Sequence, residues 1–348
     1  MPDAVIVRLP NRQPGTVIVR LPNWLGDTVM AVPAVRALRA GWSEARLILA
    51  GPWASLLAGQ GLGDVLVDYP RGWMGRLRTA DSVRSLHGDV AVLLPNSLEA
   101  TLAAQYWGAR RIVGFATGGR SWLLTEALPL PDPRQHQVDE YLLLVEHLGG
   151  VALERAPRLA APDPDDGERR EVRALLRESA GSETIDGRRR IGIHLGAAYG
   201  SAKVWPRERV IDFCRTLARA EVVVVLLGAP ADRVVADEVA RAAPALNLVG
   251  RDRPGLLTAM LAEMDVLVCG DTGVGHLAAA IGTPVVALFG PTDPRLTAPR
   301  GPCAVLRHPV ACAPCFYRSC PIEHPCLRGI EASTVRAHVD QALAMSSA

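Results

Sequence analysis

Residues 265–290 read DVLVCGDTGVGHLAAAIGTPVVALFG, and this stretch alternates strand-like and helix-like segments. DVLVCG (265–270) and VVALFG (285–290) are short apolar runs rich in β-branched residues, which is typical of buried strands. Between them a glycine-rich loop opens a helix-like segment. A strand, a helix and a second strand in this order predict a parallel βαβ unit with both faces of its sheet covered.

Five further apolar runs of the same kind lie along the chain, separated by amphipathic stretches. They are VIVRL (17–21), ARLILAG (45–51), VAVLLP (90–95), IGIHLG (191–196) and VVVVLLG (222–228). A linker rich in Pro and Asp near residues 156–168 divides this series. The sequence therefore predicts an α/β protein with two doubly wound, Rossmann-like domains, at residues 1–160 and 161–330. A C-terminal helix at 331–348 can pack on either domain through Val335, Val339 and Leu343.

Length and charge narrow the class of protein. The 348 residues exceed what one hydrophobic core usually serves, because single cores stop growing at about 250–300 residues. The formal net charge is only +2 and the basic residues are scattered, which disfavours a nucleic-acid partner. No apolar run approaches the roughly 18–20 residues that span a bilayer. No secretory signal is visible, so we expect a cytoplasmic protein whose seven cysteines are not in disulfides.

The seven residues VIVRLPN occur twice, at 5–11 and at 17–23. Only the second copy is followed by a loop, WLGDT, and a helix-like stretch, which is the order that a βα unit requires. We therefore expect the second copy to be the first strand of the first sheet. The first copy is an added edge strand, a hairpin partner or an extension at 1–15.

The loops that follow the strands are where ligands bind in open α/β sheets. In the loop that follows the predicted strand at 265–270, backbone N–H groups converge at the positive end of a helix dipole, which suits a diphosphate. The alternative is a tight turn in which Asp271 is the helix N-cap and His276 is a core residue. The residues of this loop are Asp271, Thr272, Gly273, Val274, Gly275 and His276.

Three more charged residues follow predicted strands. Lys203 supplies a mobile cation after IGIHLG, and Asp232 can accept hydrogen bonds from ribose hydroxyls or cap a helix. Asp27 follows the first strand. It is either the N-cap of the next helix or a carboxylate placed for acid–base chemistry.

Four ordered motifs carry a resemblance to a known family. They are LPNWLGDTVMAVPAVRAL (21–38), HLGAAYGSAKVWP (194–206), DTGVGHLAAAIGTPVVALFGPTDPRLTAP (271–299) and CAPCFYRSCPIEHPCL (312–327). Together they resemble the ADP-heptose:lipopolysaccharide heptosyltransferases, glycosyltransferases of the GT-B fold. The Trp before LGD and the cysteine-bearing segment look more like heptosyltransferase II than heptosyltransferase I.

The resemblance implies a site and a reaction. The family's catalytic base falls on Asp27, its donor-phosphate lysine on Lys203, and its diphosphate-and-sugar loop on 271–276. Asp232 matches a ribose-binding position that is usually Glu, one methylene longer. The implied reaction is inverting transfer of L-glycero-D-manno-heptose from ADP-heptose to the first heptose of the lipopolysaccharide inner core. The lipid-linked acceptor implies peripheral contact with the inner face of the cytoplasmic membrane.

Acceptor contacts are expected on the N-terminal domain, in the segment from Asn96 to Arg120. Arg110, Arg111 and Arg120 lie near a predicted strand end, and arginine forks suit phosphorylated or carboxylated sugars. The alternative is a solvated basic loop. The residues expected to contact the acceptor are Asn96, Arg111 and Arg120.

No metal cofactor is expected for the transfer. The D-x-D sequence at Asp163–Asp165 lies in the linker and not at a strand end, which disfavours a metal-dependent transferase. Four cysteines can alternatively form a structural metal site, although their spacing has only one short chelating pair. They are Cys312, Cys315, Cys320 and Cys326.

Two alternatives to heptosyltransferase II remain. One is another member of the same family, heptosyltransferase I or a protein-directed heptosyltransferase. The other is a cysteine-ligated metal or redox protein on the same scaffold.

Overall fold

The computed structural model describes residues 14–70, 72–181, 185–218, 222–252 and 254–345. The chain divides into two compact units. Unit 1 comprises the described residues up to Asn23 together with Pro33–Asp132 and Asp139–Leu153. Unit 2 comprises Trp24–Val32, Pro133–Val138 and the chain from Glu154 onward.

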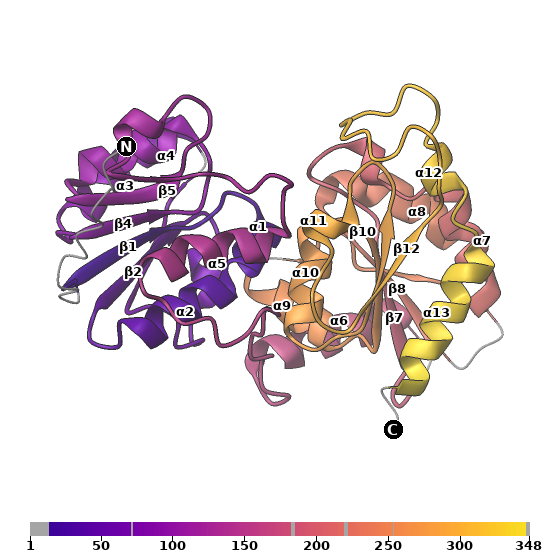
Figure 1. Cartoon of the computed structure of the whole chain (residues 1–348). Helices are drawn as coiled ribbons and strands as arrows, with labels where there is room; N and C mark the ends of the chain where they lie inside the picture. Colours follow the sequence, from indigo (N-terminus) through magenta and orange to yellow (C-terminus); the bar gives the residue numbers. More distant parts are fainter. Residues whose placement is uncertain (1–13, 71, 182–184, 219–221, 253, 346–348) are drawn as a thin grey trace. The chain divides into compact units, whose positions relative to one another are not determined.

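Unit 1 is built on a parallel sheet of six strands in the order β3-β2-β1-β4-β5-β6 (Figure 1). Each strand pairs in parallel with its neighbours, so both β2 and β4 flank the buried strand β1. The strands are β1 (Thr16–Arg20), β2 (Arg46–Gly51), β3 (Val65–Asp68), β4 (Val90–Leu93), β5 (Arg111–Phe115) and β6 (Glu126–Leu128).

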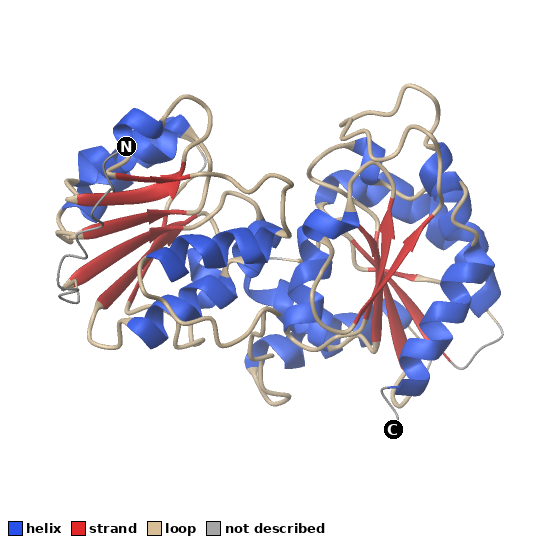
Figure 2. Ribbon diagram, in the orientation of Figure 1, coloured by secondary structure: helices blue, strands red, loops and turns tan. Residues whose placement is uncertain are grey.

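Helices cover both faces of this sheet (Figure 2). On one face, Ala80 and Val83 of α3 and Ala104 and Trp107 of α4 pack into a core with Ile18. The helices of this part of the chain are α2 (Val32–Gly41), α3 (Trp73–Arg84), α4 (Leu98–Trp107) and α5 (Gln137–His147), with short 3-10 helices η1 (Ala54–Leu57) and η2 (Ser121–Leu123).

The second copy of the N-terminal repeat is β1, as expected. Its central place in the sheet follows from its apolar residues Val17, Ile18 and Val19, all of which are fully buried. The carboxylate of Asp89 fixes the start of the strand by accepting from the backbone N–H groups of Gly15 and Thr16, both at 3.0 Å. The first copy, at 5–11, lies outside the described residues.

Unit 2 repeats the same architecture. Its parallel six-stranded sheet has the order β12-β11-β10-β7-β8-β9, so β7 takes the place that β1 has in unit 1. Both orders correspond to 3-2-1-4-5-6, the Rossmann arrangement. The strands are β7 (Arg189–His194), β8 (Val222–Leu227), β9 (Leu246–Asn247), β10 (Val266–Gly270), β11 (Val285–Phe289) and β12 (Cys303–Arg307).

The helices of unit 2 include the C-terminal helix α13, which packs here through Val335 and Val339, both fully buried. In the described chain, no helix combines the length and hydrophobicity that crossing a bilayer requires. The helices are α1 (Leu25–Met30), α6 (Gly167–Ala180), η3 (Ser201–Lys203), α7 (Arg207–Leu217), η4 (Pro230–Asp232), α8 (Arg233–Ala242), α9 (Pro254–Ala262), α10 (Gly273–Ala280), α11 (Pro294–Thr297), α12 (Pro325–Arg328) and α13 (Ala332–Met345).

The division into units is close to the expected boundary but is not a single cut. Unit 2 takes over at Glu154, near the expected position of 160. Trp24–Val32 and Pro133–Val138 also belong to unit 2, although both lie in the range expected for the first domain. For the first segment the reason is the close packing of α1 against α10, described below.

Candidate active site

The candidate site lies at the topological switch point of the second sheet. Strands β7 and β10 are neighbours there, and the chain leaves them toward opposite sides of the sheet. A crevice forms beyond the carboxyl ends of such a strand pair, which is where open α/β sheets bind ligands. The loop after β7 carries Lys203, and the loop after β10 carries Asp271.

Asp271 joins these two loops. Its Oδ2 lies 2.5 Å from Lys203 Nζ and accepts a hydrogen bond from Thr292 Oγ1 at 2.7 Å. The N-cap of α10 is Thr272 and not Asp271. The alternative interpretation of Asp271 as a helix cap is therefore wrong, because its carboxylate holds the lysine.

Lys203 is the only lysine in a sequence that contains 38 lysine and arginine residues in total. Its side chain is 12% exposed, and its ammonium lies 4.6 Å from the centre of the Tyr199 ring. The expectation of a mobile cation is wrong, because the carboxylate and the ring hold the ammonium in place. A compact ammonium with three donors suits a phosphate as a point charge, and no other side chain of this sequence supplies one.

The cysteine-bearing segment supports the lysine loop. Tyr199 donates its hydroxyl to the carbonyl of Phe316 at 2.6 Å, and the Arg318 guanidinium lies 5.3 Å from the centre of the Tyr199 ring. The backbone N–H of Ala202 donates to the carbonyl of Arg318 at 3.0 Å. Gly200 has φ 153°, and a Cβ there would collide with this same carbonyl. The segment thus fixes the backbone on which Lys203 is mounted.

Asp27 lies in the first turn of α1 and is partly buried. Trp24 is the N-cap of this helix, so the alternative role of Asp27 as N-cap is wrong. The pKa of Asp27 is raised to about 6; burial is the largest cause, the nearby Asp271 carboxylate also raises it, and Lys203 acts in the opposite direction. A carboxylate with a pKa close to neutral is suited to take a proton at physiological pH.

Two glycines allow α1 to approach α10. A Cβ at Gly273 would lie 2.7 Å from the backbone nitrogen of Gly26, and a Cβ at Gly26 would lie 2.9 Å from Cδ2 of His276. His276 is buried, and burial lowers its pKa to about 4. Its imidazole is therefore neutral at pH 7, and it forms part of the surface on which Asp27 is positioned.

The rest of the predicted diphosphate loop is used mainly for packing. Gly275 faces the sheet, because a Cβ there would lie 2.8 Å from Cys269 Sγ, and Val274 is buried. Thr272 opens α10 without a hydrogen bond from its side chain to the helix. The glycines are thus required by close helix packing, which is a different reason from the backbone approach to phosphate that the sequence suggested.

Asp232 is directed toward the backbone. Its Oδ2 accepts a hydrogen bond from the N–H of Ala229 at 2.9 Å, and its carboxylate packs against Gly196 and Gly228, where a Cβ would collide with it. It is the N-cap residue of α8 but makes no side-chain hydrogen bond to that helix. Contact with a ribose stays a prediction.

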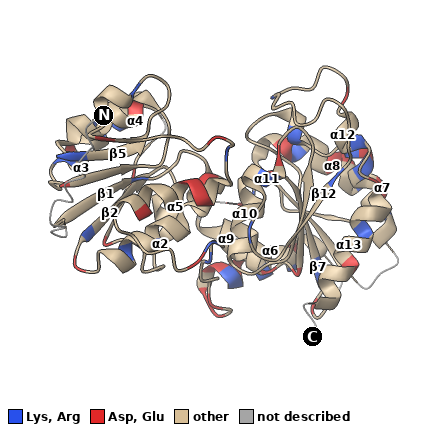
Figure 3. Ribbon diagram, in the orientation of Figure 1, with Lys and Arg blue, Asp and Glu red and all other residues tan. Residues whose placement is uncertain are grey.

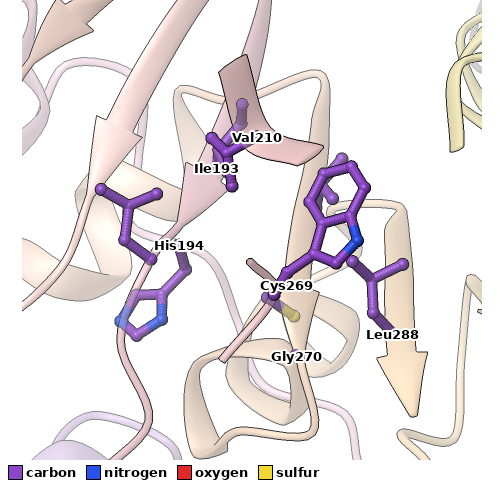
Figure 4. A pocket seen from close by; sticks show the side chains of 9 residues that line it. Ile193, His194, Val210, Cys269, Gly270 and Leu288 are labelled. Carbon is purple, nitrogen blue, oxygen red and sulfur yellow. The ribbon is translucent and has the colours of Figure 1, made fainter. Parts of the chain in front are cut away.

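A small cavity lies beneath the switch point, between strands β7, β10 and β11 (Figure 4). Its volume is about 10 Å³ and its lining is mostly apolar, including Ile193, Cys269 and Leu288. This volume holds about one water molecule and cannot hold a nucleotide. This cavity is therefore not itself a site for a sugar nucleotide.

The predicted acceptor residues of unit 1 differ in their surroundings. Arg111 opens β5 at the amino end of the strand, and its Nε lies 2.7 Å from Glu126. Arg120 is fully buried and donates to the carbonyls of Pro95 and Ser97 at 2.8 and 3.0 Å. Asn96 is exposed beyond β4 and accepts from Arg120 at 3.1 Å. The geometry favours Asn96 for a direct acceptor contact, because it is exposed beyond the carboxyl end of β4, whereas Arg111 lies at the amino end of its strand and Arg120 is buried.

Comparison with known proteins decides the family. The profile of glycosyltransferase family 9 (heptosyltransferase) matches residues 76–325, which is more than half of the chain. The chain belongs to glycosyltransferase family 9. It is therefore a glycosyltransferase, and its two Rossmann-like units are those of the GT-B fold.

Named relatives of this glycosyltransferase are heptosyltransferases. It is 27% identical over 297 residues to lipopolysaccharide heptosyltransferase 2 of Salmonella typhimurium, covering 79% of this chain and 83% of the relative. The corresponding Escherichia coli protein is 28% identical over 298 residues, with the same coverage. Among solved structures, E. coli ADP-heptose lps heptosyltransferase II has a TM-score of 0.79 at 24% identity, covering 96% of this chain and 100% of that one.

A second solved structure shows the same fold. The family 9 glycosyltransferase from Veillonella parvula has a TM-score of 0.82 at 19% identity, covering 95% of this chain and 98% of that one.

Three residues of the glycosyltransferase site had no role in the sequence analysis. Thr292 lies in a quoted motif, but only the structure shows its hydrogen bond to Asp271. Tyr199 stands four residues before Lys203, and nothing in that spacing indicates a ring beneath the ammonium. His136, in unit 2, is near enough to His276 to lower its pKa, and its Nε2 bonds to the carbonyl of Ala298 at 2.9 Å.

The four cysteines of the C-terminal segment are all free thiols in the structure. Cys326 is buried, which raises its pKa, and Cys312 and Cys320 act in the same direction. Within the described residues, no group of three or more His, Cys, Asp or Glu side chains is arranged to hold a metal ion. The expected role of these residues, stabilising the segment, stays a prediction.

Proposed function

We propose that this glycosyltransferase is a heptosyltransferase II, which transfers L-glycero-D-manno-heptose from ADP-heptose to the first heptose of the lipopolysaccharide inner core. The names of the relatives support transfer of heptose to lipopolysaccharide, and the name of the E. coli structure includes ADP-heptose. The observation that carries the proposal is the grouping of Asp27, Lys203 and Asp271, in which one carboxylate has a pKa of about 6 beside a single fixed ammonium.

Asp27 acts as the general base. The acceptor hydroxyl attacks the anomeric carbon of the heptose and loses its proton to the Asp27 carboxylate, while the bond from that carbon to the ADP oxygen breaks. With its pKa near 6, most of this carboxylate is ionised at pH 7 and is still basic enough to take the proton. One base with direct displacement inverts the configuration at the anomeric carbon.

Lys203 stabilises the leaving group. Negative charge grows on the diphosphate as the glycosidic bond breaks, and a fixed ammonium offsets it without reorganisation. Asp271, anchored by Thr292, holds the ammonium in position before the donor binds. Because Lys203 supplies the positive charge, we expect transfer to need no metal cofactor.

The remaining assignments are proposals of the same kind. The acceptor is lipid-linked, so the enzyme works at the inner face of the cytoplasmic membrane, where it meets a cytoplasmic sugar nucleotide. Asn96 contributes to the acceptor site, and Asp232 and the loop from Thr272 to His276 contribute to the donor site. Nucleic acid is not a partner, since the net charge of +2 offers no basic face.

The test is incubation with ADP-heptose and a panel of defined acceptors, followed by mass spectrometry and NMR of the new anomeric centre. We expect one heptose added to an acceptor that already carries the first heptose, with inversion. Transfer only to an acceptor without heptose would instead indicate heptosyltransferase I. Transfer only to protein would indicate a protein-directed enzyme, and no binding of ADP-heptose without metal would favour the redox alternative.

A second measurement uses the amines of the chain. Lys203 Nζ is the only side-chain amine, so an amine-selective reagent modifies at most this group and the α-amino group. We expect ADP to protect Lys203 and not the α-amino group. Equal labelling of Lys203 with and without ADP would argue against a donor site at this lysine.

A further inference from the structure

Large apolar side chains are exposed on two neighbouring helices of unit 1. On α3, Trp73 is 71% exposed, Met74 55% and Leu77 62%. On α4, Leu98 is 49% exposed and Leu102 51%. We call these five side chains the α3–α4 apolar surface. Their exposure to water is energetically unfavourable in the isolated protein. Clusters of this kind mark interaction sites more often than scattered single residues do.

The two helices form one rigid surface. Arg76 of α3 lies 3.0 Å from Glu99 of α4, and the hydroxyl of Tyr106 donates to Asp81 one to two turns further along both helices. Their inner faces pack into the same core through Val83 and Trp107, among others. Their outer faces are therefore side by side, with the apolar residues on the same side of the sheet.

The α3–α4 apolar surface lies at the functional edge of the sheet. Helices α3 and α4 follow strands β3 and β4, so their first turns start at the carboxyl ends of the strands. The five apolar residues all fall in the first half of their helices. Trp122, 77% exposed, follows β5 in the same way, and its neighbour Leu123 accepts from Gln105 of α4 at 2.8 Å.

The acidic side chains near the α3–α4 apolar surface have partners, whereas a basic side chain beside it has no ion-pair partner in the described part of the chain. Both acids on the two outer faces are engaged, Glu99 with Arg76 and Asp81 with Tyr106. Among the described residues, the exposed Arg78, one turn after Met74 on α3, has no ion-pair partner; Figure 3 draws the basic residues of α3 in blue. The surface therefore offers apolar side chains beside the uncompensated positive charge of Arg78, a composition that suits anionic lipid interfaces.

We propose that the α3–α4 apolar surface docks unit 1 onto an anionic lipid bilayer. This inference rests on the proposed function, because a lipid-linked acceptor has to be reached at a membrane. Trp73, Met74, Leu77 and the two leucines of α4 enter the interfacial region, and Arg78 contacts lipid phosphates. A second copy of the chain is disfavoured as the occupant, since a two-fold contact would bring Arg78 of both copies to one interface while Glu99 and Asp81 are already engaged.

The test is flotation of the full-length protein with vesicles of phosphatidylcholine, with and without 30% or so phosphatidylglycerol as the anionic lipid, a content chosen to give a marked surface potential. We expect the protein to float with the anionic vesicles. The variant Leu77→Ser/Leu102→Ser should bind them at least about 10-fold more weakly, since two leucines no longer leave water. The matched control Leu153→Ser/Val234→Ser removes two other exposed apolar side chains, 70% and 68% exposed, and should bind like the wild type.

A charge variant gives a second readout. Arg78→Glu should weaken binding to the anionic vesicles by about 10-fold and leave binding to phosphatidylcholine alone nearly unchanged. Arg241→Glu, on the exposed side of α8 in unit 2, is its control and should have no effect. Equal binding of Arg78→Glu and wild type would overturn the electrostatic part of the proposal.

Turnover separates this proposal from the proposed function. With a deacylated, water-soluble acceptor, Leu77→Ser/Leu102→Ser should retain wild-type turnover, whereas with acceptor in anionic vesicles its rate should fall with its binding. Wild-type protein that transfers heptose but does not float would overturn the docking proposal alone. A wild type that forms dimers which the double variant loses, with unchanged flotation, would show that a second copy covers this surface.

Discussion

At the switch point of the first sheet, between β1 and β4, the charged side chains include two fully buried arginines, whereas the second sheet has a lysine and carboxylates between β7 and β10. Arg20 lies within β1, donates to Asn23 Oδ1 at 2.7 Å, and has its pKa lowered to about 10 by burial. Arg120 donates to carbonyls at the ends of the loop after β4. Both arginines thus have their hydrogen-bond partners within the protein.

The second switch point is arranged for titration. Asp27 has a pKa moved toward neutrality, and its two charged neighbours act on that pKa in opposite directions. Identical strand order therefore does not make identical sites. A switch point is a candidate active site when its charged side chains are not fully paired within the protein, so that a ligand or a proton can pair with them.

The largest effect is expected at the base. Asp27→Asn should lower turnover by about 10²- to 10⁴-fold, the usual contribution of a positioned base, and leave donor affinity nearly intact. In the wild type, kcat/KM should fall as the pH drops through about 6, because Asp27 then becomes protonated. Steady-state rates from pH 5 to 8 measure both effects. A variant with near-normal turnover would remove the distinction between the two switch points.

Lys203→Ala should affect donor binding as well as rate. Hydrogen bonds to charged groups contribute about 1.5–3 kcal/mol, so calorimetry with ADP should show affinity lowered by about 10- to 100-fold. Lys203 lowers the pKa of Asp27, so the rate profile of this variant should also move to higher pH. Lys203→Arg is the control and should recover part of the affinity, since it keeps the charge. Unchanged ADP affinity in Lys203→Ala would contradict the assignment.

A substitution at the first switch point should lower the stability of the protein and leave donor binding unchanged. Arg120→Ala leaves the carbonyls of Pro95, Ser97 and Phe115 without their side-chain donor. We expect a loss of about 3 kcal/mol, which lowers the Tm of unit 1 by about 6–12 °C. Thermal unfolding measures it, with Arg110→Ala, an exposed neighbour, as the control. A stable Arg120→Ala variant with weakened acceptor binding would restore the acceptor role predicted from the sequence.

The ionised Asp27 carboxylate should lower the free energy of unfolding, in contrast to Arg20 and Arg120, which stabilise the fold. The pKa of Asp27 is raised on folding from its usual 3.8 to about 6, so the folded state favours the protonated form. The wild type therefore loses stability as the pH rises from about 4 to 6, by about 2 kcal/mol after allowance for solvent screening. Asp27→Asn does not titrate there and should be the more stable protein at pH 7, with the difference vanishing near pH 4. Equal Tm values at pH 7 would contradict the raised pKa.

Features that depend on residues close together in the sequence could be predicted from it. The seven apolar runs all became strands, because runs of consecutive apolar residues rich in β-branched side chains leave few alternatives. Five strands of the described chain, β3, β5, β6, β9 and β12, lie outside those runs. The residues of the three shortest, VLVD, EAL and LN in β3, β6 and β9, carry too little pattern. Asp27 and Lys203 were predicted from their positions after strands and from the family resemblance.

Other features depend on contacts between distant segments. The pKa of Asp27 follows from α1 packing on α10, which requires Gly26 and Gly273 to meet. The difference between Arg111 and Arg120 depends on where β5 begins, and the run RIVGF does not mark its own start. Only the three-dimensional structure could show that one arginine pairs with Glu126 and the other is buried among carbonyls.

The smallest effect is expected from the repeat that precedes β1. Deleting residues 1–13 should change Tm by less than about 2 °C and leave turnover unchanged, because β2 and β4 already occupy both edges of β1. Asp89 sets the start of β1 through Gly15 and Thr16, which the deletion retains. The matched control Asp89→Ala removes that anchor and should lower Tm by about 2–6 °C, since two backbone donors lose their acceptor. A larger loss from the deletion than from Asp89→Ala would show that the first VIVRLPN contributes to unit 1 elsewhere than at β1.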